Sequence, residues 1–362
     1  MTKFFPLIEV EGDAAQRGCQ YGSQTGEQIS VGIDIYKESF SNSGIEWHEA
    51  VNLAHEFIPE IEKYNKDFLI EMEGIASGSE QPLEHIVILN ARTELLFWKS
   101  KKQPKEMQEE CTAMLALPIA TKEGNLLHGQ NWDWNPKCEN SSVVLKIHNE
   151  DGPDILTFVE AGQLARSGMN SDGIALTANG LHSDQDYGRT GIPNPFIRRT
   201  LFNQQRLATA LFTITQAEIS FSHFLLVSHC GGEAVGLETT PDDVFWMQPE
   251  NGILSHANHF KIPAALANIK DMGLRRTPET IYRDSRVYAA LKENYGNITI
   301  ETFKDALADD YGKPDSVLRH PGVRPGGSLS TTVASIIMDT TAKKMWIARS
   351  PYKGIEYKEY GF

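Results

Sequence analysis

The 362-residue chain lacks the long apolar runs and the cysteine pairs that mark membrane and secreted proteins. No stretch approaches the roughly 18 apolar residues of a transmembrane helix, and the opening MTKFFPLIEVEGD has too short an apolar run for a secretory signal. The ending EYGF resembles neither a peroxisomal tripeptide nor a prenylation box. Four cysteines without a CxxC spacing do not suggest a disulfide framework in so long a chain. We therefore expect a cytoplasmic protein.

Positive charge and the common cofactor motifs are scarce too. Lys and Arg number 34 against 48 Asp and Glu, so the net charge is −14, which argues against nucleic acid or anionic membranes as partners. GxGxxG, GxxxxGK[ST] and HExxH are absent, so we predict no cofactor. His182, His229, His256 and His259 could be assembled into a zinc site. The i, i+3 spacing of the last pair is unspecific, pocket-wall or strand-end positions explain these histidines more simply, and we predict no metal.

The chain divides into a helical part and a strand-rich part. Residues 11–110 mostly show helical periodicity, and Pro59 is expected to kink or divide the second helical stretch. Residues 99–110, charged and proline-containing, are expected to form an exposed linker. Strand patterns begin at Cys111, and TKEG resembles a hairpin turn. Helices, then many antiparallel strands, then helices and a final hairpin predict a layered α+β domain.

Cys111 stands at the head of the strand-rich part, directly after the linker, and two interpretations fit it. A free cysteine is most often a small buried hydrophobic residue. Alternatively, the chain is cut before Cys111, which then carries both a thiol and an α-amine. The pKa of a thiol is ~8.5 and that of an α-amine is ~8, so the amine can take the thiol proton near neutral pH. One residue would then supply both nucleophile and general base. Spacing alone favours the structural interpretation.

The motifs along the chain resemble those of the penicillin acyltransferase (acyl-coenzyme A:6-aminopenicillanate acyltransferase-like) family of N-terminal nucleophile hydrolases. They are EMEGIASGS and LNARTEL, CTA and GQNWDW, then VEAGQLARSGMNSDGIALTANGL, VGLE, SHANH and STTVASIIMD. Their order and spacing cover nearly the whole chain. The resemblance implies a four-layer αββα sandwich, in which a helical α chain (1–110) and a β chain (111–362) form one structural domain after autocleavage. A higher oligomer is compatible with it.

By position, the resemblance also implies four catalytic residues and a cleavage site. Each residue has an ordinary alternative as a strand-end, loop or turn residue. A neutral amide donor suits the charge that develops on a tetrahedral intermediate. The implied residues are Cys111 as nucleophile after cleavage between Glu110 and Cys111, Asp133 in processing and catalysis, Asn258 in the oxyanion hole, and Ser328 near the active site.

Two positions depart from the fungal penicillin enzymes of this family. Leu329 follows Ser328 where those enzymes have an arginine, which weakens the expectation of their substrate. Glu110 precedes the nucleophile where those enzymes have a glycine. Glycine permits backbone strain that glutamate tolerates poorly. We therefore do not predict a penicillin-making enzyme.

Four further residues are candidates for the substrate pocket. Trp132 and Trp134 flank Asp133, and strand alternation places them on the face opposite to it. Core packing is their default role, and lining an acyl pocket is the alternative. His259 is a candidate pocket-wall residue. Arg324, in RPGG, could reach an anionic substrate group, although a solvated surface arginine is the simpler interpretation.

These features predict an autoprocessed cysteine amidohydrolase acting on a small-molecule amide. The Cys111 thiolate would attack the amide carbonyl, and water would hydrolyse the resulting thioester; a second amine would instead give acyl transfer. Hydrolysis is preferred because water needs no second binding site. N-acyl amines and N-acyl amino acids are the expected substrates, and the resemblance makes a β-alanyl amine one concrete candidate. A zinc-dependent hydrolase and a non-catalytic binding protein remain open as functions of other classes.

Overall fold

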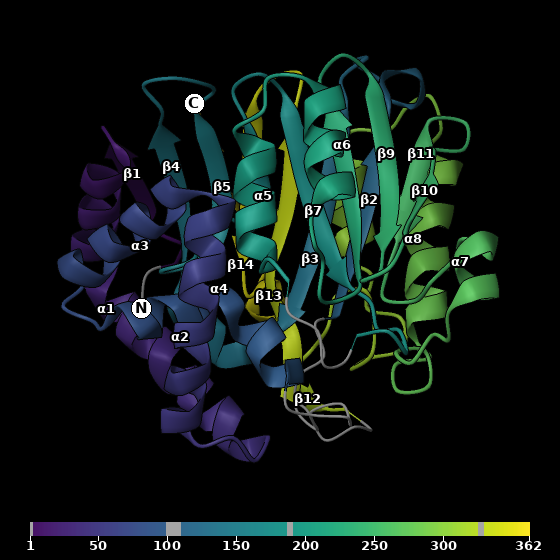
Figure 1. Cartoon of the computed structure of the whole chain (residues 1–362). Helices are drawn as coiled ribbons and strands as arrows, with labels where there is room; N and C mark the ends of the chain where they lie inside the picture. Colours follow the sequence, from purple (N-terminus) through teal and green to yellow (C-terminus); the bar gives the residue numbers. More distant parts are fainter. Residues whose placement is uncertain (1–2, 99–109, 187–190, 325–328) are drawn as a thin grey trace.

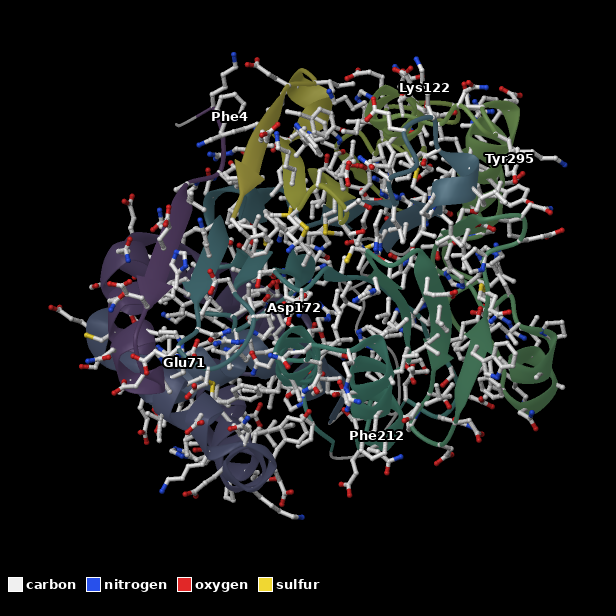
Figure 2. The ribbon with its side chains drawn as sticks, turned by 90° about the horizontal axis from the view of Figure 1, so that it is seen from above. Phe4, Glu71, Lys122, Asp172, Phe212 and Tyr295 are labelled. Carbon is white, nitrogen blue, oxygen red and sulfur yellow. The ribbon has the colours of Figure 1, made fainter. Side chains whose placement is uncertain are left out.

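The computed structural model describes residues 3–98, 110–186, 191–324 and 329–362, which form four layers (Figure 1). Two β-sheets pack face to face between two layers of helices. Seen from above in Figure 2, Glu71 and Phe212 lie on one side of the sheets, and Lys122 and Tyr295 lie on the opposite side. The predicted αββα sandwich is therefore confirmed.

The first sheet has eight strands within the described residues, in the order β1-β4-β5-β6-β7-β8-β9-β10. Its pairs are antiparallel except for β1 and β4, which run parallel. The strands are β1 (Leu7–Glu11), β4 (Ser142–His148), β5 (Ile155–Glu160), β6 (Ser167–Asn170), β7 (Ile174–Gly180), β8 (His223–His229), β9 (Glu233–Thr239) and β10 (Val244–Met247).

The second sheet carries Cys111 and has the order β11-β2-β3-β13-β14-β15, with β12 paired to β13. β2 and β3 are antiparallel and connect through TKEG, so the predicted hairpin is confirmed, with Cys111 opposite Trp132. The predicted hairpin near the C-terminus is β13–β14, but it does not close the chain, because β15 follows and pairs with β14. The strands are β2 (Glu110–Ala116), β3 (Leu127–Trp134), β11 (Ile253–His256), β12 (Gly322–Val323), β13 (Leu329–Asp339), β14 (Lys344–Arg349) and β15 (Tyr357–Gly361).

Helices cover the outer face of each sheet. α1, α5 and α6 contact the first sheet, with α2, α3 and α4 packed beside them, whereas α8 and α9 contact the second sheet. None of the described helices is both long and apolar enough to cross a membrane. The helices are α1 (Ala14–Asn42), α2 (Trp47–Tyr64), α3 (Lys66–Gly78), α4 (Leu83–Trp98), α5 (Asn194–Phe202), α6 (Leu207–Gln216), α7 (Pro263–Asn268), α8 (Thr280–Glu293) and α9 (Ile300–Leu307).

The second helical stretch divides at Asn65 and not at Pro59, where the sequence predicted a kink or a break. Pro59 lies inside α2. Asn65 has an extended backbone (φ −160°, ψ 110°), and its side chain accepts a hydrogen bond from the backbone N–H of Asp67. It therefore ends α2 and caps the start of α3, because a side-chain oxygen satisfies one of the free N–H groups there.

Glycines bring α1 and α3 into close contact. A Cβ atom on Gly22 would lie 2.3 Å from the carbonyl oxygen of Ile75, and one on Gly78 would lie 2.3 Å from that of Cys19. Any larger residue would push the two helices apart. The EMEGIASGS motif therefore has a structural reason, since it supplies Gly74 and Gly78 to this contact.

The two faces of β2 and β3 have different surroundings. On the inner face, Cys111 and Trp132 belong to the apolar core between the sheets. On the outer face, Met114 packs with Val287 of α8 and Phe303 of α9. Because side chains alternate along a strand, Glu110 and Thr112 lie on this outer face, beneath α8.

Candidate active site

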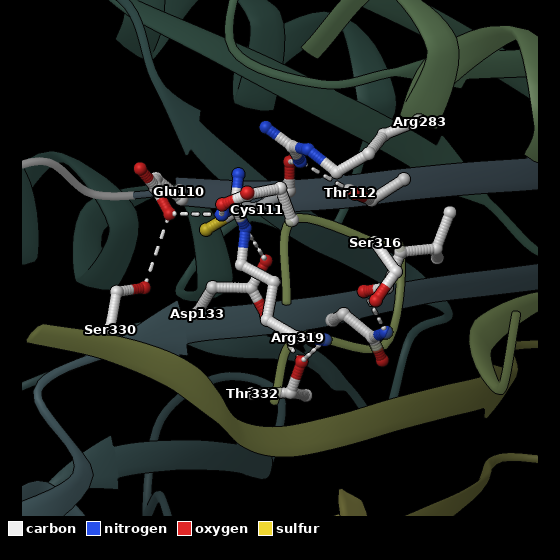
Figure 3. A network of polar contacts seen from close by, with 12 residues as sticks. Glu110, Cys111, Thr112, Asp133, Arg283, Ser316, Arg319, Ser330 and Thr332 are labelled. Carbon is white, nitrogen blue, oxygen red and sulfur yellow. Dashed lines mark hydrogen bonds and ion pairs between the residues drawn. The ribbon is translucent and has the colours of Figure 1, made fainter. Parts of the chain in front are cut away.

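The backbone of Cys111 is held by two side chains from distant parts of the chain. Its N–H donates to Oδ1 of Asn258 at 2.8 Å, and its carbonyl oxygen accepts from Nη1 of Arg283 at 2.8 Å (Figure 3). Nη2 of Arg283 donates to the same Oδ1 of Asn258 at 2.9 Å. The side chain of Cys111 is fully buried. The peptide group on each side of Cys111 is therefore fixed in a water-poor site.

Asn258 reaches Cys111 from the segment after β11 and connects the two sheets. Its Nδ2 donates to the carbonyl oxygen of Gly180, at the end of β7, at 3.0 Å. Its backbone N–H donates to Oγ1 of Thr280, at the start of α8, at 2.6 Å. The amide oxygen of Asn258 thus faces Cys111, and its amide nitrogen faces Gly180. The predicted oxyanion role of Asn258 stays a prediction.

Arg319 is the centre of a buried ionic network on the outer face (Figure 3). Its Nη1 lies 2.9 Å from Oε2 of Glu110, and its Nε lies 3.4 Å from Oδ2 of Asp133. Its Nη2 donates to Oε1 of Glu279 at 2.5 Å, and Asp315 lies 3.4 Å from Nη1. Burial alone would lower the pKa of Arg319, but the carboxylates of Glu110, Asp133 and Glu279 raise it. One guanidinium is shared among four carboxylates.

Asp133 lies opposite Glu110 in the strand pairing and is fully buried. Its Oδ1 accepts a hydrogen bond from Oγ1 of Thr332 at 2.6 Å. Burial raises the pKa of Asp133 to about 6, and the Glu110 carboxylate adds to the rise, although Arg319, Arg283 and Thr332 oppose it. With a pKa near neutrality, Asp133 can exchange a proton under ordinary conditions.

Glu110 belongs to a strand and not to the predicted exposed linker, whose other residues, 99–109, lie outside the described residues. It is the first residue of β2, and its side chain is fully buried. Its Oε2 accepts from Oγ of Ser330 at 3.1 Å, and Nε of Arg324 lies 3.7 Å away. The prediction of exposure is wrong at Glu110 because two arginines and a hydroxyl replace water around its charge.

Arg324 is also not the solvated residue that the sequence suggested. Only 3% of its surface is exposed. Nη1 donates to Oδ1 of Asp315 at 2.7 Å and to the carbonyl oxygen of Pro314 at 3.0 Å, and Nη2 donates to the carbonyl oxygen of Ser330 at 2.9 Å. The expectation failed because these acceptors fold around the guanidinium. Arg324 faces the Glu110 carboxylate instead of solvent.

A family model described as acyl-coenzyme A:6-aminopenicillanic acid acyl-transferase matches residues 119–350. The chain belongs to this family. The 40 kDa form of the acyl-coenzyme A:6-aminopenicillanic-acid-acyltransferase of Emericella nidulans is 27% identical over 348 residues, which cover 93% of this chain and 90% of that protein. The predicted family is therefore confirmed, and with it the coarse function of an enzyme of the acyltransferase and amidohydrolase type.

Solved structures that resemble this acyltransferase-family chain include a bile acid hydrolase and a penicillin acylase. A mutant of the conjugated bile acid hydrolase from Clostridium perfringens is 16% identical, with a TM-score of 0.47, covering 69% of this chain and 92% of that chain. Penicillin V acylase from Agrobacterium tumefaciens is 13% identical, with a TM-score of 0.45, covering 69% of this chain and 84% of that chain.

The pocket candidates of this family member lie at different depths. Trp132 is fully buried, with the guanidinium of Arg166 at 4.1 Å from its ring centroid. Nε1 of Trp134 donates to the hydroxyl of Tyr36 at 3.1 Å. Both tryptophans belong to the main apolar core, in which Trp134 also faces the guanidinium of Arg92 of α4. His259 is partly buried, and burial, helped by His256, lowers its pKa to about 4. Contact of these three side chains with substrate stays a prediction.

In the part of the chain that the structure describes, the four histidines considered for zinc do not form one cluster, although the rings of His256 and His259 stack with 6.0 Å between their centroids. No group of three or more His, Cys, Asp or Glu residues in these ranges is arranged to hold a metal. Nε2 of His256 lies 2.9 Å from Oε1 of Glu238, and the His256 ring stacks on Phe224 with 3.7 Å between centroids. His256 thus has a complete structural environment of its own.

Sequence reasoning missed the two arginines that organise this site, and Ser328, which it included, lies outside the described residues. Arg283 had a detectable signal, because it shares the buried stripe of α8 with Val287 and Leu291, a position where an arginine is unexpected. Arg319 had no such signal, since it lies in an irregular segment between α9 and β12.

Proposed function

We propose that this chain is the precursor of a cysteine amidohydrolase, which cuts itself between Glu110 and Cys111 and then hydrolyses a small amide. The main support is the fixation of the Cys111 backbone, with its N–H on Asn258 and its carbonyl on Arg283. The nitrogen held at 2.8 Å by Asn258 is the one that becomes the α-amine after cleavage. This fixation supports the proposal, because a nucleophile and a base that are held in place before the reaction face a lower barrier.

Self-cleavage would begin with attack of the Cys111 sulfur on the carbonyl carbon of Glu110. The sulfur and the Cys111 nitrogen then share that carbon in a five-membered ring. The C–N bond breaks as the nitrogen takes up a proton, which leaves Glu110 as a thioester on Cys111, and water hydrolyses the thioester. Asp133, beside this peptide and with a pKa of about 6, is the group suited to exchange the proton.

Turnover in the cut enzyme would use the same atoms. The α-amine of Cys111 takes the thiol proton, and the thiolate attacks the substrate carbonyl. The amine part of the substrate leaves with a proton, and water releases the acid from the thioester. Asn258 can donate to the oxyanion once its Nδ2 exchanges the bond to Gly180 for the substrate oxygen.

The substrates that we propose are N-acyl amines and N-acyl amino acids, and a β-alanyl amine stays a candidate. Acyl transfer is the second candidate function, because both the family model and the Emericella nidulans relative are described as acyltransferases. The yield of transferred product at increasing concentrations of an added amine distinguishes the two outcomes. The cytoplasmic location and a higher oligomer stay predictions.

Intact mass and N-terminal sequencing of the purified protein test the proposal. We expect two fragments, the second beginning at Cys111, and amidase activity that chelators do not remove. Cys111→Ala should give one uncut, inactive chain, whereas Cys19→Ala, which changes an exposed thiol, should be cut and active. An active Cys111→Ala protein would refute the mechanism. Zinc-dependent activity or an uncut native chain that does not react with thiol alkylators would favour the two other classes.

A further inference from the structure

The Glu110 side chain occupies a site built for a carboxylate, one residue before the nucleophile. Nη1 of Arg319 at 2.9 Å, Oγ of Ser330 at 3.1 Å and Nε of Arg324 at 3.7 Å all face its Oε2. All four side chains are almost completely buried. Two arginines from the segment before β13 and a serine from β13 itself therefore converge on one carboxylate.

This carboxylate is attached to the carbonyl that Cys111 attacks in the proposed self-cleavage. The sulfur and the nitrogen of Cys111 bind the same carbon in the ring intermediate, so that carbon moves little between the peptide and the thioester. The Glu110 thioester is thus an acyl-enzyme with Glu110 as its acyl group. A substrate carbonyl must later reach the same carbon position.

Self-cleavage separates Glu110 from the catalytic chain and leaves the donors around its carboxylate. Among the residues that the structure describes, Nη1 of Arg319 would keep only Asp315 at 3.4 Å, and Oγ of Ser330 would lose the acceptor that it has in the uncut chain. Asp133, Glu279 and Asp315 still face Arg319, and Asp315 still pairs with Arg324. Buried donors without an acceptor are costly, so the emptied site favours a new anionic oxygen.

We propose that the emptied Glu110 site binds the distal carboxylate of the substrate's acyl group, so that the mature enzyme prefers amides of a five-carbon dicarboxylic acid. This inference rests on the proposed self-cleavage and amidase function. From its carbonyl carbon to its carboxylate, Glu110 has the same chain of five carbons as a glutaryl group. A shorter or longer diacid would place its carboxylate away from Arg319 and Ser330.

The reaction on such a substrate is a hydrolysis. The Cys111 thiolate forms a C–S bond to the glutaryl carbonyl carbon, the C–N bond breaks, and the amine leaves with the proton taken from the thiol. Water then cleaves the thioester and releases glutarate, and the thiol proton is restored. A β-alanyl group would instead bring an ammonium toward Arg319 and Arg324, which repel it.

Two matched anilides test the inference on the wild-type protein after mass spectrometry has shown that it is cut. Glutaryl-p-nitroanilide and pentanoyl-p-nitroanilide have equal chain lengths and differ only in the distal carboxylate. We expect kcat/KM to be roughly 50-fold higher for the glutaryl compound, because only its carboxylate can accept charge-assisted hydrogen bonds from the arginines. Succinyl, adipyl and β-alanyl anilides should be poorer than the glutaryl compound. Equal rates for the glutaryl and pentanoyl anilides would overturn the acid site while leaving the amidase function intact.

Variants locate the preference in the structure. Ser330→Ala keeps the backbone pairing of Ser330 with Gly322 and should reduce the glutaryl-to-pentanoyl ratio about 5-fold, mainly through KM. Arg324→Gln should reduce it further. Glu110→Gln is the matched control: it should slow self-cleavage, but the cut enzyme should keep the wild-type ratio because Glu110 has left with the α chain. A changed ratio in cut Glu110→Gln protein would show that the α-chain end still occupies the site, which would refute the inference.

A binding measurement covers the case in which the cut protein hydrolyses neither anilide. Glutarate should slow the alkylation of Cys111 by iodoacetamide at concentrations where pentanoate does not. Equal protection by the two acids, or none, would overturn the acid site. An uncut protein without amidase activity would instead refute the proposed function itself.

Discussion

Two buried arginine–carboxylate networks in this molecule have opposite balances of charge. In the helical layer, Arg199 binds Glu71 through two parallel hydrogen bonds of 2.9 Å, and Arg17 adds a third contact at 3.2 Å. Two arginines thus share one carboxylate. Beside Cys111, Arg319 is shared among Glu110 and three other carboxylates. The first network satisfies its carboxylate completely, as a structural contact requires.

The second network leaves part of its carboxylate oxygens without hydrogen bonds. Oε1 of Glu110 and Oδ2 of Asp133 are buried and have no hydrogen-bond partner among the described residues. Burial is the main cause that raises the pKa of Asp133 to about 6, and the Glu110 carboxylate adds to the rise, whereas Arg319 and Arg283 oppose it. The same pair of residue types thus forms a fully hydrogen-bonded contact around Glu71 and an incompletely hydrogen-bonded one around Glu110 and Asp133, where the pKa of Asp133 is raised.

Replacing the arginine of the structural network should have the largest effect on stability. Arg199→Met leaves the buried Glu71 with Arg17 alone and should lower the free energy of unfolding by about 3 kcal/mol. Urea denaturation of a Cys111→Ala background, which stays one chain, measures this change. Cleavage after residue 110 in the variant that keeps Cys111 should be unaffected. Impaired cleavage in well-folded Arg199→Met protein would show that the two networks are coupled.

Removing the exchangeable proton of Asp133 from the second network should have a large effect on the rate of self-cleavage. Asp133→Asn keeps the size of the side chain but removes its charge and its pKa near neutrality. We expect self-cleavage to slow on the order of 100-fold, as measured by intact mass over time after synthesis. The variant should fold, since a neutral amide relieves the excess of negative charge around Arg319. Self-cleavage at the wild-type rate would exclude Asp133 as the proton-exchanging group.

A smaller effect is expected from the hydroxyl that supports Asp133. Thr332→Val removes the 2.6 Å hydrogen bond to Oδ1 and should lower the free energy of unfolding by about 1–2 kcal/mol. It should also raise the pKa of Asp133, because this hydrogen bond lowers it. Urea denaturation at several pH values measures both effects. A Thr332→Val protein with wild-type stability at every pH would mean that solvent or another donor replaces the hydroxyl.

The sequence predicted the strand hairpin and the family correctly, because both depend on local patterns and ordered motifs. It misassigned Glu110 for a physical reason: the charged composition of the preceding segment indicates solvent, whereas the groups that compensate Glu110 come from Arg319, Arg324 and Ser330, more than 200 positions later. Long-range ion pairs leave no periodicity in a sequence. Arg283 differs, since its place on the buried stripe of α8 could have been read from the spacing alone.

The smallest expected effect is the displacement that Glu110→Gln should cause in the pH dependence that Asp133 gives to stability. Because the folded pKa of Asp133, about 6, is above its ordinary value of 3.8, the folded chain binds more protons than the unfolded chain between these values. The contribution of Asp133 to the free energy of unfolding is therefore present below about pH 4 and is lost as the pH rises to about 6.

Urea denaturation of Cys111→Ala protein between pH 4 and 7 should show a fall in stability to which Asp133 contributes, and adding Asp133→Asn should make that fall smaller. Adding Glu110→Gln instead should move the fall to lower pH, because the Glu110 carboxylate raises the pKa of Asp133. Burial raises the pKa of Asp186 to about 7, but this residue contributes equally to all three proteins and cancels in the comparison. If stability falls over the same pH range in the Glu110→Gln protein, the two carboxylates are not coupled through Arg319. The contrast between the two networks would then lose its electrostatic basis.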